Sequence, residues 1–282
     1  INNTGTSLLL NILVNEEHKV KKFVVASSRA VYGEGKYRKK DGQIVFPGSR
    51  KLINLKQRRF DLYDEFNDEV LEVLPTTEDS KIDPASFYGI TKLFQEQAVL
   101  SVCKSLDISA SAFRYQNVYG PGQSLSNPYT GILAIFSNLI LQDKAINIFE
   151  DGKESRDFVY IDDVVNATIR GLEHEEANDK VYNVGSGIAT SVEDIAGLLM
   201  KLYSKEVPIS ISGDFRLGDI RHNFADISKI QNDLEFNPSV ALSDGLQKFT
   251  NWVTSQPEIN SQESYKNSLE IMKYKKLLFN GK

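Results

Sequence analysis

The sequence has a single cysteine, Cys103, among its 282 residues. One thiol excludes an internal disulfide and suits a reducing compartment, so we expect a cytoplasmic protein. The three histidines, His18, His174 and His222, are scattered along the chain. Their spacing predicts no metal site.

Long apolar runs and an excess of positive charge are also missing. No stretch approaches the roughly 20 apolar residues that a membrane span needs, and the formal net charge is −5. We therefore expect neither a membrane nor a nucleic acid as a partner. The chain is long and apolar enough for one large core or two modest ones.

What the sequence does contain is an alternation of strand-length apolar runs with helical patterns. This alternation is typical of an α/β fold built on a parallel sheet. Pro121, Gly122, Asn127 and Pro128 mark a break that divides the chain. Before it we expect helices over 5–14 and 87–104 and strands over 23–26 and 108–115. After it we expect a strand over 145–149 and helices near 131–141, 164–172, 192–203 and 242–253.

Two segments stand apart from this pattern. Residues 34–80 form a long, charged insertion, which could be a lid over a site, a solvated excursion or a packing flap. The tail is polar after residue 256 and amphipathic around 265–278, so we expect it to dock as a helix.

Tyr88 and Lys92 supply a pattern that carries chemistry. They lie four residues apart at the start of an expected helix, and residues i and i+4 share a helix face. A nearby cation favours a phenolate, so a tyrosine placed this way can exchange a proton with an alcohol. Upstream, the hydroxyls of Ser27 and Ser28 follow the apolar run 23–26, at the end of an expected strand.

These residues resemble the extended short-chain dehydrogenase/reductase family, in particular its NAD-dependent nucleotide-sugar epimerases and dehydratases. The resemblance runs along nearly the whole chain. Its motifs are SSRAVYG at 27–33, YGITK at 88–92, FRYQNVYGPG at 113–122, RDFVYIDDV at 156–164, VYNVGSG at 181–187 and RLGDIRH at 216–222. Residues 116–131, 215–226 and 265–278 are most similar to the dTDP-L-rhamnose 4-epimerases of that family.

The resemblance implies a Rossmann-type, doubly wound parallel sheet with a smaller α/β substrate domain. Residues 1–119 would be the C-terminal part of the dinucleotide-binding domain, and 120–282 would be mainly substrate domain. Residues from about 156 to 173 would pack back on the first domain. The glycine-rich turn that holds the cofactor pyrophosphate is absent from this sequence, and the family would place it upstream of Ile1. We therefore expect an incomplete chain.

The resemblance also assigns catalytic and cofactor-binding residues. Tyr88 would be the acid and base, Lys92 its electrostatic partner and a ligand of the nicotinamide ribose, and Ser28 the hydroxyl that bonds the reacting sugar oxygen. Ser28 could instead cap the turn after the strand. Three further residues would lie near NAD: Ser27, Asn2 and Tyr115. Ser27 is also a weaker candidate for the proton-relay role assigned to Ser28. Asn2 could instead cap a helix, and Tyr115 could instead be a core residue.

A nucleoside-diphosphate sugar is the implied substrate. Asn117, Arg156 and Arg216 match positions that hold the diphosphate or its ribose, with Asn127 and Arg221 as secondary candidates. Guanidinium groups suit phosphate oxygens, but Arg156 and Arg216 could instead pair with the neighbouring Asp157 and Asp219. Asp162 and Asp163 are expected to cap a helix rather than bind a metal.

The position before Tyr32 separates the reactions of the family. Dehydratases carry an acidic pair where this chain has Arg29 and Ala30, so water removal is disfavoured. The resemblance therefore implies a 4-epimerase that oxidises C4 transiently through NAD, with dTDP-L-rhamnose as the expected substrate. The alternatives are a UDP-hexose or UDP-N-acetylhexosamine 4-epimerase and a non-catalytic nucleotide-sugar-binding protein. Members often form homodimers through the two helices expected at 5–14 and 87–104.

Overall fold

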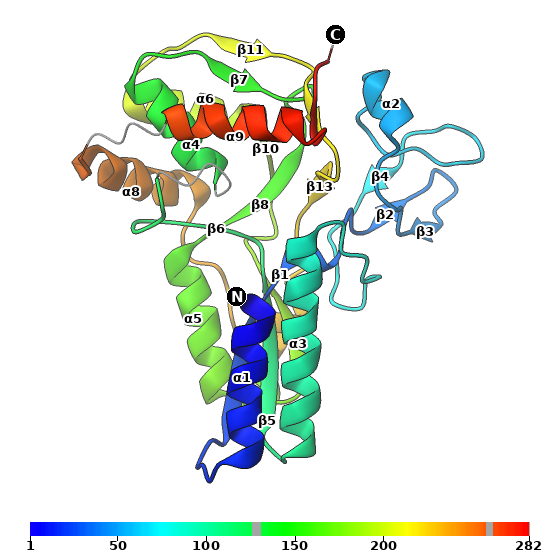
Figure 1. Ribbon diagram of the computed structural model, residues 1–282, viewed down its shortest axis with the longest axis vertical. Helices are drawn as coiled ribbons and strands as arrows, with labels where there is room; N and C mark the ends of the chain where they lie inside the picture. The colour runs from blue at the N-terminus through cyan, green and yellow to red at the C-terminus, as the bar shows by residue number, and fades with distance from the viewer. Residues whose placement is uncertain (126–130, 258–261, 282) are drawn as a thin grey trace.

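The computed structural model describes residues 1–125, 131–257 and 262–281 (Figure 1). A narrow lobe carries the N-terminus and the long helices, and a broader lobe above it carries the C-terminal part of the chain. The insertion forms a separate projection beside the broader lobe. No helix within the described residues is long and apolar enough to cross a membrane.

The narrow lobe is built on a parallel sheet in the order β1-β5-β9. Its strands are β1 (Lys22–Ser28), β5 (Ser109–Tyr115) and β9 (Lys180–Val184). One face packs against α1 (Asn2–Asn15) and α3 (Phe87–Ser105), and the other against α5 (Ile161–Glu173) and α7 (Ser228–Leu234). Helices on both faces explain why β5 is almost wholly buried. The expected Rossmann-type α/β architecture is confirmed.

The broader lobe has its own sheet and core. The sheet has the order β10-β8-β13, with β6 also paired to β8, and α4, α6 and α8 enclose the apolar core. Two smaller pairs are β7 with β11 and β12 with β14. The elements are β6 (Asn117–Tyr119), α4 (Ile132–Leu141), β7 (Ile146–Ile148), β8 (Ser155–Tyr160), β10 (Ala189–Ser191), α6 (Val192–Tyr203), β11 (Ile209–Ile211), β12 (Phe215–Arg216), β13 (His222–Asn223), α8 (Leu242–Ser255), α9 (Gln262–Tyr274) and β14 (Leu278–Phe279). The short turn η2 (Glu175–Ala177) lies in the narrow lobe, where Ala177 joins the core beside α5 and α7.

The insertion is a packed unit rather than a solvated excursion. It contains β2 (Tyr37–Arg38), β3 (Ile44–Val45), α2 (Leu52–Lys56) and β4 (Glu72–Val73), and its strands pair in the order β3-β2-β4. Leu55 and Phe60 pack on Phe215 of the broader lobe. The backbone of Thr76 also exchanges hydrogen bonds with Phe224 and Asp226. The insertion therefore packs against the broader lobe and is tied to it by backbone hydrogen bonds.

One expected helix boundary is wrong, and the error changes the role of an aspartate. The helix expected near 164–172 begins at Ile161, so Asp163 lies within its first turn. The Asp163 carboxylate does not cap the helix but accepts hydrogen bonds from the backbone of Ser239 and Val240. Asp163 therefore holds a loop that is distant in sequence, instead of capping its own helix as expected.

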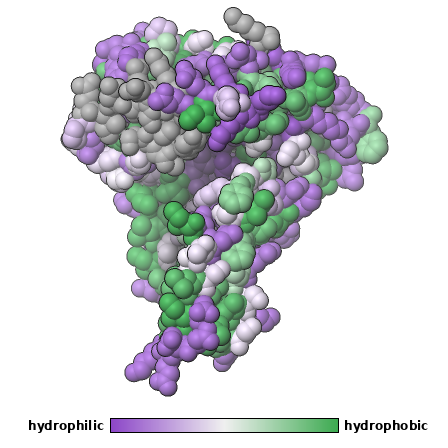
Figure 2. Space-filling view, viewed as in Figure 1, coloured by the Kyte–Doolittle hydropathy of each residue, from purple (hydrophilic) through white to green (hydrophobic). Residues whose placement is uncertain are grey.

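Apolar side chains are exposed along the narrow lobe (Figure 2). They include Leu8, Leu9, Ile12 and Val14 of α1, Ile90 and Phe94 of α3, and Val165, Ile169 and Leu172 of α5. The same view shows a hollow bordered by hydrophilic side chains where the two lobes meet.

Candidate active site

A cavity of about 730 Å³ lies where the two lobes meet. Ser28 and Tyr88, two of the three expected catalytic residues, both line it. A second cavity of about 220 Å³ shares Asn117, Gly131, Ile132 and Asp219 with the first. The two cavities therefore adjoin, and we call them the large and the small cavity.

Tyr88 is held in the first turn of α3. The Ser86 side chain caps this helix by accepting a hydrogen bond from the Gly89 backbone N–H at 3.0 Å. The Thr91 hydroxyl donates to the Tyr88 carbonyl at 2.8 Å and accepts from Asn2 Nδ2 at 3.1 Å. The Tyr88 side chain is 53% exposed, so its phenol is accessible from the large cavity.

Lys92 lies one helical turn below Tyr88. Its ammonium donates to Gln95 Oε1 at 3.0 Å, and Gln95 donates to Thr6 of α1 at 2.7 Å. Burial lowers the pKa of Lys92. Asn2 thus contacts the helix turn that carries Tyr88, and Thr6 and Gln95 orient the ammonium.

Ser28 ends β1 and opens the 3₁₀ turn η1 (Arg29–Val31). Its hydroxyl accepts a hydrogen bond from the Ala30 backbone N–H at 3.2 Å, so it caps this turn as well as lining the large cavity. The turn packs closely on α3, because a Cβ built at Gly89 would lie 2.5 Å from the Ala30 carbonyl oxygen. This close approach fixes Ser28 relative to Tyr88.

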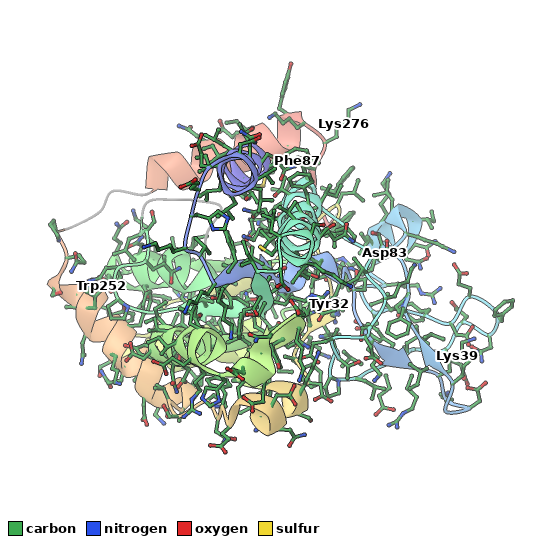
Figure 3. All side chains as sticks on the ribbon, turned by 90° about the horizontal axis from the view of Figure 1, so that it is seen from below. Tyr32, Lys39, Asp83, Phe87, Trp252 and Lys276 are labelled. Atoms are coloured by element: carbon green, nitrogen blue, oxygen red, sulfur yellow. The ribbon has the colours of Figure 1, made fainter. Side chains whose placement is uncertain are left out.

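A network of hydrogen bonds between buried polar side chains lies next to the site, at the end of β1. Ser27 donates to Glu96, which forms a two-point ion pair with Arg114. Arg114 donates to the Tyr32 hydroxyl at 2.7 Å, which in turn donates to Asn183 Oδ1 at 2.7 Å. In Figure 3 Tyr32 lies beside β1, Phe87 marks the start of α3, and Asp83 lies between that helix and the insertion carrying Lys39. Ser27 therefore belongs to this hydrogen-bond network and does not line either cavity.

The small cavity is lined by charged groups. Arg156 and Arg216 face it together with Glu150, Glu154 and Asp219. The Arg216 guanidinium lies over the Phe149 ring, 5.1 Å from its centroid, and its buried Nε has no hydrogen-bond partner. The Asp219 side chain is 46% exposed and accepts a 3.3 Å hydrogen bond from Arg156. Arg156 also donates to three backbone carbonyls, those of Ser155, Ile220 and Arg221.

Two expected site residues, Arg221 and Tyr115, do not line either cavity. Arg221 is 1% exposed, and its guanidinium pairs with Asp61, Glu150 and Asp151 rather than lining a cavity. The Tyr115 hydroxyl bonds with Thr168, and its ring packs on the core beside α5. Asn127 lies outside the described residues.

Neither Arg156 nor Arg216 pairs with the aspartate near it in sequence, the alternative considered for each. Asp219 accepts a hydrogen bond from Arg156 rather than from its neighbour Arg216. Asp157, in contrast, accepts hydrogen bonds from the backbone N–H groups of Ser186, Gly187 and Ala225. It fixes the loop that follows β9 and has no bond to Arg156.

The sequence did not identify Glu150, Glu154 or Arg50 as residues of this region. Glu150 and Glu154 flank the sequence Asp151-Gly152, which is typical of a turn, and this was the available signal. Arg50 comes from the insertion and bonds to Glu150 and to the Asp219 carbonyl. No local pattern indicates that contact. Within the described residues, no group of three or more histidine, cysteine or acidic side chains is placed to hold a metal ion.

Comparison with known proteins bears on what this arrangement does. The NAD dependent epimerase/dehydratase family matches residues 63–185. A dTDP-L-rhamnose 4-epimerase of Burkholderia thailandensis is 38% identical over 257 residues, which are 91% of this chain and 69% of that protein. A UDP-glucose 4-epimerase of Mycolicibacterium smegmatis is 34% identical over 62% of this chain and 55% of its own length.

A solved structure agrees with these relatives. The UDP-glucuronic acid 4-epimerase of Bacillus cereus, in complex with UDP-glucuronic acid and NAD, aligns with a TM-score of 0.69 at 28% identity. The alignment covers 90% of this chain and 67% of that one. The chain thus spans between about half and about two thirds of the length of these three proteins.

Proposed function

Because this chain belongs to the NAD dependent epimerase/dehydratase family, we propose that it acts as a nucleotide-sugar 4-epimerase through transient oxidation at C4. The observation that carries the proposal is the adjacency of the two cavities. Ser28 and Tyr88 line the large one and would face the sugar. Arg156 and Arg216 line the small one and would hold the diphosphate.

Tyr88 is the acid and base of the proposed reaction. It removes the proton of the sugar 4-hydroxyl, while Ser28 donates a hydrogen bond to the same oxygen and Lys92 stabilises the phenolate. Bound NAD would supply the hydride acceptor and donor for C4. Tyr88 then returns the proton to the oxygen. Between the two transfers the sugar must rotate, so the site grips the diphosphate firmly and the sugar loosely.

The residues near Tyr88 suit the nicotinamide ribose of NAD. The Lys92 ammonium has three donors and makes one hydrogen bond, to Gln95, which leaves donors for ribose hydroxyls. Tyr88 and Lys92 would hold this half of the cofactor, with Asn2 steadying their helix through Thr91. Ser27 and Tyr115 are engaged by Glu96 and Thr168 and would support the cofactor through packing.

dTDP-L-rhamnose is the substrate favoured by the relatives. The Burkholderia thailandensis protein covers far more of this chain than the UDP-glucose 4-epimerase does. A UDP-hexose or UDP-N-acetylhexosamine is the second candidate, because the Bacillus cereus structure holds a UDP-sugar in the same fold. Arg29 and Ala30 line the large cavity where water removal would need carboxylates, which favours epimerisation in both cases.

A homodimer and a cytoplasmic location complete the proposal. Leu8 with Ile12 on α1 and Ile90 with Phe94 on α3 are apolar pairs at i, i+4 that remain exposed. Burial of these pairs against a second copy would remove apolar surface from water. The single cysteine supports a reducing compartment.

Isotope labelling tests the proposed reaction. The protein is incubated with NAD and dTDP-L-rhamnose carrying deuterium at C4, and the sugars are followed by mass spectrometry and proton NMR. We expect the C4 epimer with its label retained, no deuterium incorporated at carbon from heavy water, and no net consumption of NAD. Loss of the label to solvent, or loss of one water, would overturn the epimerase proposal. Turnover of UDP-sugars alone would reject the substrate, and binding without any turnover would favour a non-catalytic nucleotide-sugar-binding protein.

A further inference from the structure

Arg29 occupies a fixed position in the large cavity. It begins the turn η1 directly after Ser28 and lines the cavity with Ser28, Tyr88 and Asp219. The Ser28 hydroxyl caps the turn, and the Ala30 carbonyl packs against Gly89 in the first turn of α3. The backbone that carries Arg29 is therefore held against the helix turn that carries Tyr88.

The Arg29 guanidinium has no hydrogen bond to any described residue. Arg29 is half-buried. The buried Arg50, Arg114 and Arg221 differ sharply from it, because each forms two or more hydrogen bonds with carboxylates. A guanidinium carries five N–H donors, so those of Arg29 are available to a ligand in the large cavity that the residue lines. Burial lowers the pKa of Arg29 to about 10, so it remains a cation at neutral pH.

Three guanidiniums share a single carboxylate at the junction of the cavities. Arg29, Arg156 and Arg216 all lie close enough to Asp219 to lower its pKa. Arg50, a fourth cation near Asp219, is already paired with Glu150. Glu34 lies within electrostatic reach of Arg29 but accepts from the Arg221 backbone N–H and faces Arg50. Asp219 forms its ion pair with Arg156 alone. Neither Arg29 nor Arg216 forms an ion pair with a described carboxylate, so a diphosphate could accept hydrogen bonds from both guanidiniums.

The three arginines do not occupy equivalent places. Arg156 and Arg216 line the small cavity, Arg29 lines the large cavity with Tyr88, and Asp219 borders both. A nucleotide sugar that places its sugar at Tyr88 and its nucleotide at Arg216 has the sugar-bearing phosphate between them. Arg29 would face that phosphate from the sugar side, because it lines the large cavity and not the small one.

We propose that Arg29 binds the β-phosphate, the phosphate attached directly to the sugar, and thereby anchors the sugar beside Ser28 and Tyr88. The inference rests on the proposed function, because it takes a nucleoside-diphosphate sugar as the ligand. It adds a third guanidinium, from the narrow lobe, to the two that the broader lobe supplies. The substrate would then be held by both lobes at once.

Calorimetry with the 282-residue chain tests this assignment without requiring turnover. dTMP lacks the β-phosphate and dTDP carries it, and UMP and UDP serve as the second pair. For Arg29→Gln we expect the Kd for the diphosphate to rise roughly 10- to 100-fold, the range for hydrogen bonds to a charged group. The Kd for the monophosphate should stay within about twofold, and Arg29→Lys should recover part of the loss because it keeps the charge.

Arg38→Gln is the matched control. Arg38 is an exposed arginine of the insertion paired with Glu72, so its loss should leave both affinities unchanged. Equal weakening of monophosphate and diphosphate in Arg29→Gln, or an unchanged ratio between them, would overturn the inference while the proposed function stands. A wild-type chain that binds none of the four nucleotides would overturn the proposed function and the inference together.

Discussion

The Arg50 guanidinium grips both carboxylate oxygens of Glu150, each at 2.7 Å, although 100 residues separate the two in sequence. The same guanidinium donates to the Asp219 carbonyl at 2.8 Å. Glu150 and Asp219 both line the small cavity. The insertion therefore braces two walls of the proposed diphosphate site without lining the cavity with Arg50 itself.

Breaking the Arg50–Glu150 pair should be costly for the fold. The Arg50 side chain is only 3% exposed, so Arg50→Gln leaves the buried Glu150 carboxylate with only its longer, 3.3 Å bond to Arg221. We expect Arg50→Gln to lower the free energy of unfolding by about 2–4 kcal/mol, and Arg50→Gln with Glu150→Gln to recover part of it. Urea unfolding measures both variants. Arg38→Gln breaks an exposed ion pair and should lower the free energy of unfolding by less than about 1 kcal/mol. An equally small loss for Arg50→Gln would show that the Arg50–Glu150 pair does not stabilise the fold.

Replacing the proposed acid and base should separate turnover from binding. Tyr88→Phe removes only the phenolic oxygen of a side chain that is half exposed to the large cavity. We expect kcat to fall by about 10²- to 10⁴-fold with little change in the affinity for a nucleoside diphosphate. Steady-state kinetics and calorimetry give the two values. Tyr274→Phe, at an exposed tyrosine, should change neither, and near-normal turnover in Tyr88→Phe would remove Tyr88 from the mechanism.

The two arginines of the small cavity should respond differently to truncation. Arg216 stacks on Phe149 and has an unpartnered Nε, so Arg216→Ala should weaken nucleoside-diphosphate binding by about 1.5–3 kcal/mol with little effect on the Tm. Arg156 also donates to three backbone carbonyls, so Arg156→Ala should lower both affinity and Tm. Calorimetry and thermal unfolding distinguish the cases. Unchanged affinity in both variants would exclude the proposed diphosphate clamp.

Stability should fall with rising pH because of Glu154. Burial raises the pKa of this carboxyl to about 7, from an ordinary value of 4.5. Below about pH 4.5 the group is protonated in both the folded and the unfolded state, so it contributes no difference. Between about pH 4.5 and pH 7 the carboxyl is ionised in the unfolded state but still protonated in the folded state, so the free energy of unfolding decreases as the pH rises. This loss of stability is complete above about pH 7.

Glu154→Gln removes that penalty. We expect the variant to exceed the wild type by about 1–3 kcal/mol at pH 8 and to match it closely at pH 4.5. Urea unfolding at the two pH values gives the comparison. Burial also raises the pKa of Glu34 to about 7, so Glu34→Gln is a parallel variant at a position away from both cavities. An equal difference between Glu154→Gln and the wild type at both pH values would show that Glu154 does not titrate in this range.

Local patterns explain what the sequence predicted well. The helix expected over 192–203 has those bounds in the structure, because a serine cap precedes it and its apolar positions follow the helical period. Ser28 and Tyr88 reach the same cavity because a strand end and a helix start adjoin at one edge of the sheet. The roles assigned to the site residues stay predictions until the variants are measured.

Distant partners explain what the sequence did not reveal. Arg221 belongs to a motif that suggests ligand binding, yet carboxylates at 61, 150 and 151 surround it. Asp163 was expected to cap its own helix and instead holds the loop at 239–240. In both cases the local pattern is compatible with two roles, and tertiary pairing selects one.

The pairing of Arg50 with Glu150 and Asp219 has a consequence for the order of folding. Contacts between residues that are far apart in the chain form only after the intervening segments have closed, which costs loop entropy first. We therefore expect each lobe to acquire its own sheet before the wall of the small cavity is complete. A nucleotide could bind that wall only in the last step, so it would act on the nearly finished protein by slowing its unfolding rather than by speeding its early folding.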